Sequence, residues 1–452
     1  MAEVEQIVNP STRLEALRSA LDAGSMRPAK RMINALHPAE VASLIESLRP
    51  AERQILWELV PADNEGDILL GLNDEVRASI IATMDDEEIV AAADGMELDD
   101  LADFLIDLPE AIIQQVMHSM DQQHKDRLQA VLAYPEDSAG GLMNPDTVTV
   151  RPDVSIEVVL RYLRLSGGVP DKTDALFVVN RNDLYLGTLP LTTLLTADPA
   201  LAVSEVMDSD PVHLLADTSA AKVAMQFSDR DLLSAAVVDE KGQLLGRITI
   251  DDVVDVIREQ GEHSLMSMAG LDEDEDMFAP VFSSARRRAV WLGVNLATAF
   301  LASWVVGLFQ ATLDQVVVLA ILMPIVASMG GIAGSQTLTL MIRGIALGQV
   351  EKSNSHWLLN KEIMVGLLNG VAWASIVALA VVLWFGDWRI GAVIAAALII
   401  NLVVAAISGV GIPLLLRRLG VDPALAGSVV LTTFTDVIGF AAFLGLGSLV
   451  LL

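Results

Sequence analysis

Five apolar segments follow residue 288, and each is long enough to cross a lipid bilayer. A helix needs about 20 mainly apolar residues to span the hydrocarbon layer. The expected spans are residues 289–309, 316–342, 363–385, 390–416 and 425–451. The chain is also 53% hydrophobic. These features predict a multidomain membrane protein with an all-α, five-helix transmembrane domain over residues 289–452.

Basic residues predict how the spans are oriented. Arg389 is the only basic residue on one side of them. Eight lie on the other side: Arg286, Arg287, Arg288, Arg343, Lys352, Lys361, Arg417 and Arg418. Loops rich in Lys and Arg stay in the cytoplasm, and the polar N-terminus is not a signal peptide. We expect a multi-pass protein of the cell (inner, plasma) membrane, with the soluble part in the cytoplasm and the C-terminus outside.

The soluble part of the chain is strongly acidic. Residues 285–452 contain six acidic and nine basic residues, so the first 284 residues hold 53 of the 59 acidic and 20 of the 29 basic residues. Such a surface repels nucleic acid and anionic lipid headgroups and attracts cations. Because the chain has no cysteine, metal ligands would be oxygen atoms, which suit hard ions such as Mg²⁺ and Ca²⁺.

In the first domain an apolar residue recurs every twelve positions. The first series is Leu36, Leu48, Val60, Leu72, Met84, Met96, Leu108, Met120 and Leu132. In a second series, each residue comes four positions before a member of the first: Leu44, Leu56, Ile68, Ile80, Ala92, Phe104, Val116 and Leu128. Positions four apart share a helix face. The pattern therefore predicts short helices stacked into an all-α superhelical domain over residues 1–134.

Acidic clusters in this domain are candidate regulatory metal ligands. The candidates are Asp85, Asp86, Asp99 and Asp100. Carboxylates in the first turn of a helix also compensate the helix dipole and improve solubility. That alternative explains each of these residues taken singly.

The second domain, residues 135–258, contains an internal duplication. Residues 175–195 align without a gap on residues 234–254, and Gly187 falls on Gly246. Each copy is expected to form a strand, a helix, a hairpin and a second helix. The pair resembles tandem cystathionine-β-synthase (CBS) domains, which implies an α/β fold that binds adenine nucleotides such as ATP, or metal ions.

The second copy has the residues suited to a nucleotide. Thr249 and Asp252 have the Thr-x-x-Asp spacing that fits ribose hydroxyls in such domains. Leu191, Thr192 and Thr193 occupy that region in the first copy. One nucleotide site is therefore expected, not two.

An acidic helix is expected to lead toward the membrane. Asp251, Asp255 and Glu259 are spaced to share one helix face, with Asp252 beside them. Like charges at this spacing repel, and a bound divalent cation would reverse that effect, so all four are candidate metal ligands. Residues 259–288 would form an acidic, plug-like connecting helix, and its acidic run at 272–276 could equally be a solvated linker.

The predicted second span contains residues that weaken a helix buried in lipid. Residues 322–336 include Pro324, three glycines, two serines and Gln336. Such backbone is tolerated where it lines a cavity or pathway. The candidate pathway residues are Gly330, Gly331, Gly334 and Gln336. The alternative is that the Gly-x-x-x-Gly spacing forms a face on which two helices pack closely.

One acidic residue, Asp436, lies inside the predicted fifth span. An ionised carboxylate at that depth costs several kcal/mol unless it meets water, a cation or a basic partner. No Lys or Arg occupies the middle of any predicted span. A cation or water therefore remains, and Thr432 and Thr435 add oxygen atoms nearby. The alternative is a neutral Asp hydrogen-bonded to glycine-rich backbone.

Together these motifs resemble the MgtE family of magnesium channels and transporters. They are Pro-x-x-x-x-Met-Gly-Gly-x-x-Gly-x-Gln from Pro324, Thr-Thr-x-Thr-Asp ending at Asp436, and Tyr-Pro-Glu-Asp-Ser-Ala-Gly from Tyr134. The resemblance covers nearly the whole chain. It implies a homodimer, a pore between the second and fifth spans, hydrated Mg²⁺ held at Asp436, and closure by cytoplasmic Mg²⁺ bound between acidic domains.

Two further points bear on function. Five spans cannot form two equal inverted halves, which favours a pathway on a dimer axis. Ile332 stands where much of the family has Asn, which leaves the choice between Mg²⁺ and Co²⁺ open.

The spans offer one acid and no His, so an enzyme is not expected. We expect a Mg²⁺-selective channel or transporter that takes up magnesium. The alternatives are a divalent-cation carrier with broader selectivity, and a membrane Mg²⁺ sensor that transports nothing.

Overall fold

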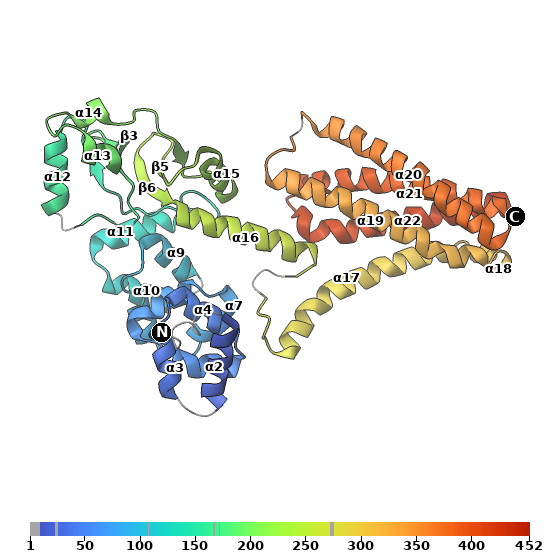
Figure 1. Cartoon of the computed structure of the whole chain (residues 1–452), viewed down its shortest axis with the longest axis horizontal. Helices are drawn as coiled ribbons and strands as arrows, with labels where there is room; N and C mark the ends of the chain where they lie inside the picture. Colours follow the sequence, from blue (N-terminus) through green and yellow to red (C-terminus); the bar gives the residue numbers. More distant parts are fainter. Residues whose placement is uncertain are drawn as a thin grey trace. The chain divides into compact units, whose positions relative to one another are not determined.

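The computed structural model describes residues 10–452 except 23–25, 107, 166, 167, 171, 272–274 and 352. The chain divides into two compact units. The first comprises residues 1–260 and 274–279, and the second comprises residues 261–273 and 280–452. Figure 1 colours the chain from the short N-terminal helices (blue) to the long C-terminal helices (orange and red).

The first unit begins with short helices that, from α3 onward, restart every twelve residues. They are α2 (Pro10–Asp22), α3 (Met26–Ile33), α4 (Pro38–Glu46), α5 (Pro50–Trp57), η2 (Ala62–Asn64), α6 (Glu65–Leu70), α7 (Asp74–Ile81), α8 (Asp86–Ala93), α9 (Leu98–Ile106), α10 (Glu110–Ser119) and α11 (Gln122–Val131). Pro38 and Pro50 begin their helices, while Asn73 and Asp85 cap theirs by accepting backbone N–H groups, as helix N-termini favour. The whole second apolar series is buried, whereas Leu132 is 38% exposed.

Two three-stranded sheets with the same topology follow. The strands are β1 (Thr149–Val150), β2 (Ala175–Val179), β3 (Tyr185–Pro190), β4 (His213–Leu215), β5 (Ser234–Val238) and β6 (Leu244–Thr249). The helices are α12 (Ile156–Leu165), α13 (Leu191–Thr196), α14 (Val203–Val206), α15 (Ala220–Arg230) and α16 (Ile250–Met268). In each sheet the first strand runs parallel to the second, which pairs antiparallel with the third.

The two repeats touch where their sequences align. Asn144 and Asp208 lie ahead of the first and second repeat, and each forms a β-bridge with the other repeat. A Cβ on Gly187 would lie 2.1 Å from the Asp208 carbonyl oxygen, and one on Gly246 would lie 2.8 Å from the Asn144 carbonyl oxygen. Glycine is therefore required at both positions because the backbones approach so closely.

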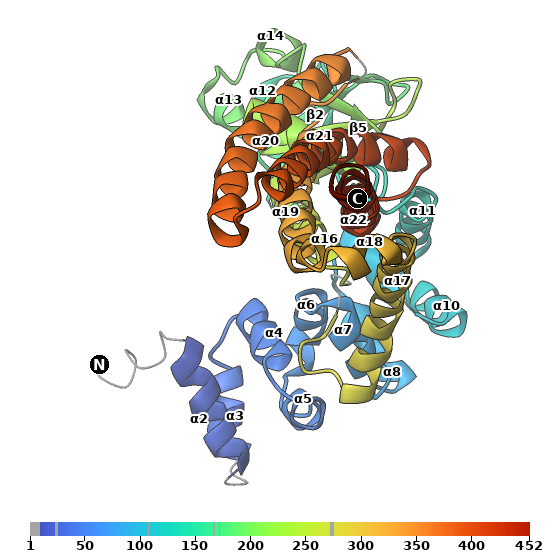
Figure 2. The same ribbon diagram turned by 90° about the vertical axis from the view of Figure 1, so that its right-hand side faces the viewer.

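The second unit contains five long apolar helices. They are α17 (Val281–Gly307), α19 (Val318–Ala346), α20 (Ser355–Phe385), α21 (Trp388–Arg418) and α22 (Pro423–Leu451), with the short α18 (Gln310–Gln315) after the first. Each is long and apolar enough to cross a membrane. Figure 2 shows α21 inside the bundle, where it contacts α19, α20 and α22. The predicted fold class is confirmed: helical N domain, paired α/β repeats and five apolar helices.

Two details of the membrane helices differ from the sequence-based expectation. α19 runs unbroken past Pro324, because a proline removes a single hydrogen bond and the neighbouring helices hold the remainder in place. α17 begins at Val281 and α20 at Ser355, each earlier than the predicted residues 289 and 363, and so α20 includes Glu362. Because α16 ends at Met268, the expected connecting segment 259–288 is not one continuous helix.

Candidate functional site

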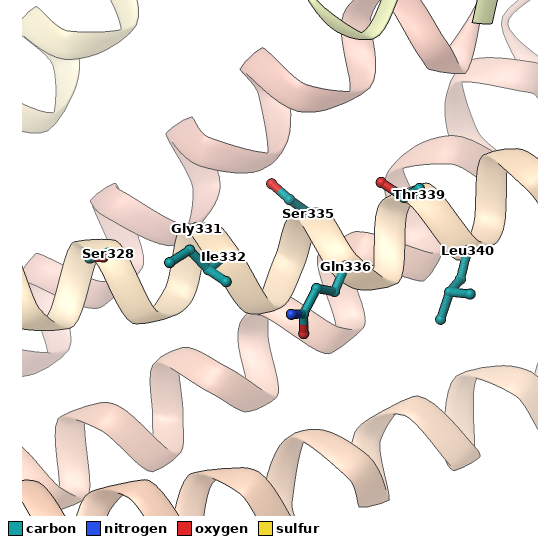
Figure 3. Close-up of a pocket in the computed structure, with 7 residues that line it drawn as sticks. All are labelled: Ser328, Gly331, Ile332, Ser335, Gln336, Thr339 and Leu340. Atoms are coloured by element: carbon teal, nitrogen blue, oxygen red, sulfur yellow. The ribbon is translucent and has the colours of Figure 1, made fainter. Parts of the chain in front are cut away.

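One face of α19 forms an open groove with a volume of about 850 Å³. Its lining residues are Ser328, Gly331, Ile332, Ser335, Gln336, Thr339 and Leu340. They recur three or four residues apart, as one helix face requires. Figure 3 shows Ser335 and Thr339 pointing to one side of this face and Gln336 and Leu340 to the other. Polar side chains are thus exposed on a helix apolar enough to lie in lipid.

The opposite face of α19 packs closely against its neighbours. A Cβ on Gly330 would lie 2.2 Å from the Asn401 amide nitrogen, and one on Gly334 would lie 3.0 Å from the Leu431 side chain. The two explanations of the glycine motif therefore apply to different residues. Gly330 and Gly334 form the packing face, while Gly331 and Gln336 line the groove.

Asp436 lies half-buried on α22. Among the described residues, none pairs with its carboxylate. The hydroxyl of Thr435, fully buried, donates to the carbonyl oxygens of Leu431 (3.2 Å) and Thr432 (3.1 Å). Thr432 donates to the carbonyl oxygen of Ser428 at 3.0 Å. Both hydroxyls thus bond to their own helix, which leaves their lone pairs as possible ligands.

A second, smaller cavity of about 150 Å³ lies at the N-terminal end of α22. It is lined by Ala269, Gly270, Trp291, Asn295, Leu425, Ser428, Val429 and Thr432. Ala269 and Gly270, in the middle of the predicted connecting segment, therefore lie beside α17 and α22. His263 Nε2 lies 3.1 Å from the carboxylate of Asp422, which caps α22.

Sequence reasoning missed two buried polar residues in the bundle. Asn401 on α21 is fully buried. Glu362 is 5% exposed and accepts a hydrogen bond from the Thr337 hydroxyl at 3.2 Å, and Lys361 Nζ lies 2.9 Å from its other oxygen. Glu362 lies just outside the predicted third span, and a lone Asn in an apolar run was the only signal for Asn401.

In the first unit, α9 and α16 bring predicted metal ligands together. Burial, followed by the charges of Asp252 and Asp100, raises the pKa of Asp99 to about 8. Burial, followed by the charge of Glu97, raises the pKa of Asp100 to about 6. Burial and the charge of Asp251 raise the pKa of Asp252 to about 6. These carboxyl groups therefore repel one another when ionised.

Lys172 partly neutralises this acidic interface. Its ammonium forms an ion pair with Asp251 and lies 3.5 Å from Glu97. Burial alone would raise the pKa of Asp251, but hydrogen bonds from Lys172 and Thr249 outweigh it and lower that pKa. The Asn144 amide donates to Glu97 (2.9 Å) and to Asp99 (3.2 Å).

Further along α16, burial and the charge of Asp255 raise the pKa of Glu259. Burial, followed by the charges of Glu136, Asp100 and Glu259, raises the pKa of Asp103 to about 7. The acidic face of α16 thus lies against acidic residues of the N domain. Asp255 itself lies 3.6 Å from Arg258.

Other predicted metal ligands have structural partners. Asp85 and Glu88 form a capping box at the start of α8, with hydrogen bonds of 2.9 and 3.0 Å. Asp86 accepts from the Gln115 amide at 3.4 Å. In the part of the chain that the structure describes, no cluster of three or more His, Asp or Glu has the geometry to hold a metal ion. Residues 272–274 of the acidic run lie outside the described residues.

The predicted ribose-binding pair is close together. Asp252 Oδ2 accepts a hydrogen bond from the backbone N–H of Thr249 (3.1 Å), while the single hydroxyl hydrogen of Thr249 is shared between Asp252 (3.0 Å) and Asp251. The two side chains satisfy each other at the start of α16, so a ribose would have to share or replace these bonds.

Comparisons with known proteins agree with this architecture. Family models match for the MgtE intracellular N domain (residues 36–137), the CBS domain (139–200 and 203–259) and the MgtE divalent cation transporter domain (323–446). The chain is similar to the magnesium transporter MgtE of Thermus thermophilus, at 30% identity over 96% of this chain and 98% of that protein. The Bacillus subtilis magnesium transporter MgtE is 26% identical over 94% of each chain.

A solved structure of the cytosolic domain of the Mg²⁺ channel MgtE in complex with ATP is 31% identical to this chain. It covers 54% of this chain and 99% of its own, with a TM-score of 0.49. The two relatives named as magnesium transporters match this chain over 96% and 94% of its length. The chain belongs to the MgtE family of divalent cation transporters and is not an enzyme.

Proposed function

We propose that two copies of this chain form a Mg²⁺-selective channel or transporter for magnesium uptake. The supporting observation is the α19 groove, where Ser328, Gln336 and Thr339 are exposed on a membrane helix. Polar side chains facing lipid lack hydrogen-bond partners. A second copy placed over this face would enclose a water-filled path with polar walls. The relatives named as magnesium transporters support Mg²⁺ as the transported ion.

The path would run past Asp436 on α22. A carboxylate without a protein cation suits a hydrated divalent ion, because hard oxygen ligands bind Mg²⁺ together with its waters. Gly331 and Gln336 would line the wall of the path, while Gly330 and Gly334 on the packing face would set how closely α19 approaches its neighbours. Thr432 and Thr435 would add oxygen atoms.

Mg²⁺ uptake into liposomes by the purified protein tests this proposal. Asp436→Ala and Asp436→Asn should abolish uptake while the protein still elutes as a folded dimer, because the lost group is a ligand. The matched control is Asp387→Asn, which removes a charge at the α21 N-cap but keeps a good capping residue. Wild-type uptake by the Asp436 variants would refute the proposal.

Ile332 offers a test of selectivity. Its side chain is 57% exposed and lines the groove. Ile332→Asn adds an amide oxygen there, so the ratio of Mg²⁺ to Co²⁺ uptake should change more than the yield of folded protein. An unchanged ratio would mean that the side chain does not face the ions.

Cytoplasmic Mg²⁺ would close the path by binding between the N domain and α16. The raised pKa values of Asp99, Asp100 and Asp252 support this: burial is the largest cause, the charges of neighbouring carboxylates add to it, and a divalent cation would offset that added repulsion. Residues 261–271 would carry the change to the membrane, since His263 and Gly270 contact the membrane helices there.

An adenine nucleotide such as ATP would bind at Thr249 and Asp252. The Thr249 hydroxyl and the Asp252 carboxylate suit ribose hydroxyls, while Lys172 nearby, which pairs with Asp251 in this structure, suits phosphate. Titration calorimetry with ATP would test this, and absence of heat change in the wild-type protein would refute it. The basic residues beside the membrane spans favour a position of the soluble domains on the cytoplasmic side of the plasma membrane.

A further inference from the structure

The Asn401 side chain is a buried polar group at the centre of the membrane bundle. It comes from α21 and has no exposed surface. Its amide Nδ2 donates a hydrogen bond of 2.8 Å to the Val326 carbonyl oxygen on α19. Its Oδ1 has no hydrogen-bond partner among the described residues. An unpaired buried acceptor costs about 1–3 kcal/mol, so a simple packing role is better served by an apolar side chain.

Two glycines leave room for this amide, one on each neighbouring helix. A Cβ on Gly330 of α19 would lie 2.2 Å from Asn401 Nδ2, and one on Gly439 of α22 would lie 2.8 Å from it. Real Cβ atoms do not approach so closely. Asn401 therefore lies between α19 and α22, and the distance between those helices at this level depends on its side chain.

The same two helices carry the candidate ion path. Gly330 is adjacent to Gly331, which lines the groove. Gly439 follows Asp436 by three residues, or about one helical turn. A change in the spacing of α19 and α22 at Asn401 would therefore move Asp436 relative to the groove wall.

We propose that Asn401 is a positioning residue for ion permeation: its amide holds α19 against α22 at the level of Gly330 and Asp436. The hydrogen bond to Val326 fixes α19, and the contact with Gly439 fixes α22. The Oδ1 atom lies within the same junction, 3.0 Å from the Cβ position of either glycine. The inference rests on the proposed ion path and names a residue that acts on it without touching the ion.

The test measures Mg²⁺ and Co²⁺ uptake by full-length protein in liposomes for wild type, Gly330→Ala, Asn401→Ala and the double variant. Gly330→Ala should lose most Mg²⁺ uptake, because its methyl group collides with the amide. The double variant should regain about tenfold relative to Gly330→Ala, since the space is vacated. Asn401→Ala alone should change the Mg²⁺ to Co²⁺ ratio, which a purely structural role would leave unchanged.

Gly445→Ala is the matched control on α22. Its added methyl group meets its nearest neighbour, Phe309, at an ordinary 3.9 Å. Uptake and ion ratio should stay at wild-type values. Gly439→Ala, on the same helix, should lose uptake and regain it when combined with Asn401→Ala.

The proposal is overturned if Asn401→Ala transports both ions like wild type, or if the double variant folds and stays as inactive as Gly330→Ala. If Asn401→Ala alone does not fold, the double variant decides the question. In that variant the methyl group added at position 330 fills part of the space that the Asn401 amide leaves. Uptake by the wild-type protein in the same assay separates the proposed function from the proposed role of Asn401. Wild type without Mg²⁺ uptake refutes the proposed function, while unfolding midpoints of the four proteins still report whether positions 330 and 401 are coupled.

Discussion

Asp99 shows how a single residue links the fold to the cation chemistry. It is 7% exposed on α9, and its pKa lies near 8 where the ordinary value is 3.8. The compact arrangement therefore binds a proton more tightly than the unfolded chain does. Ionisation of such a group opposes packing. At neutral pH a proton on Asp99 or a nearby cation is needed to relieve its repulsion by the neighbouring carboxylates.

The sign of the pH dependence follows. The raised pKa favours the folded state when the carboxyl is protonated, so this contribution is lost as pH rises from about 4 through 8. Without divalent ions, the midpoint temperature for thermal unfolding of the soluble part should decrease as the pH is raised from 5.5 to 8.5. Added Mg²⁺ should restore more of it at pH 8.5.

Asp99→Asn should flatten this dependence by about 2–4 °C, because the amide keeps a polar group of the same shape without the charge. The exposed Asp63 gives the control, since Asp63→Asn should leave the slope unchanged. If the midpoint temperature depended on pH equally in wild type and Asp99→Asn, the dependence would not come from Asp99.

Between elements, one ion pair ties the segment that follows α16 to the N domain. Arg53 on α5 donates two hydrogen bonds, of 2.6 and 2.7 Å, to Asp276, which follows α16 in the chain. Arg53 is 2% exposed and Asp276 is 5% exposed. The Arg53 guanidinium also donates to the carbonyl oxygens of Ile45 and Glu46, at 3.1 Å each. Residues 275–279 thus pack with the N domain as part of the first unit.

Removing one partner of this pair should be costly. Arg53→Ala removes the guanidinium that pairs with the buried Asp276 carboxylate, which should destabilise residues 1–279 by about 3–5 kcal/mol in urea unfolding. Arg53→Met combined with Asp276→Leu should recover most of that loss, because two apolar groups need no partner. The exposed Arg49–Glu52 pair is the control: Arg49→Ala should cost less than about 1 kcal/mol. A small effect of Arg53→Ala would mean that water reaches the pair.

At the scale of the whole molecule, charge should make the soluble domains respond to Mg²⁺. The first 284 residues carry 53 acidic and 20 basic residues, so their compact arrangement repels itself. Several weak carboxylate sites acting together would give a sharp response, because a ligand shifts an equilibrium only by its differential affinity.

Millimolar Mg²⁺ should therefore slow proteolysis of the soluble part, while NaCl of matched ionic strength should not. Deleting residues 1–134 should weaken Mg²⁺-dependent closure in the liposome assay. Equal protection in both salts would show that the acidic surface only aids solubility.

Local patterns predicted much of the architecture. The twelve-residue period marks where the helices of the N domain restart, because positions four apart must share a face. The alignment of Gly187 with Gly246 identified the duplication, and apolar length alone located five spans. These features depend on neighbours in sequence, so no tertiary contact is needed to read them. The predicted domain boundaries and ion-site residues remain predictions.

Tertiary structure decided what lies opposite each face. The motif around Gly330 and Gln336 fitted both a pathway and a packing face, and the fold assigned one side of α19 to each. Nothing local to Asn401, Lys172 or Asp276 names its partner. Helix period and charge determine which residues lie together on a surface, but burial and pairing depend on which distant element packs against that surface, and only the folded chain brings those elements together.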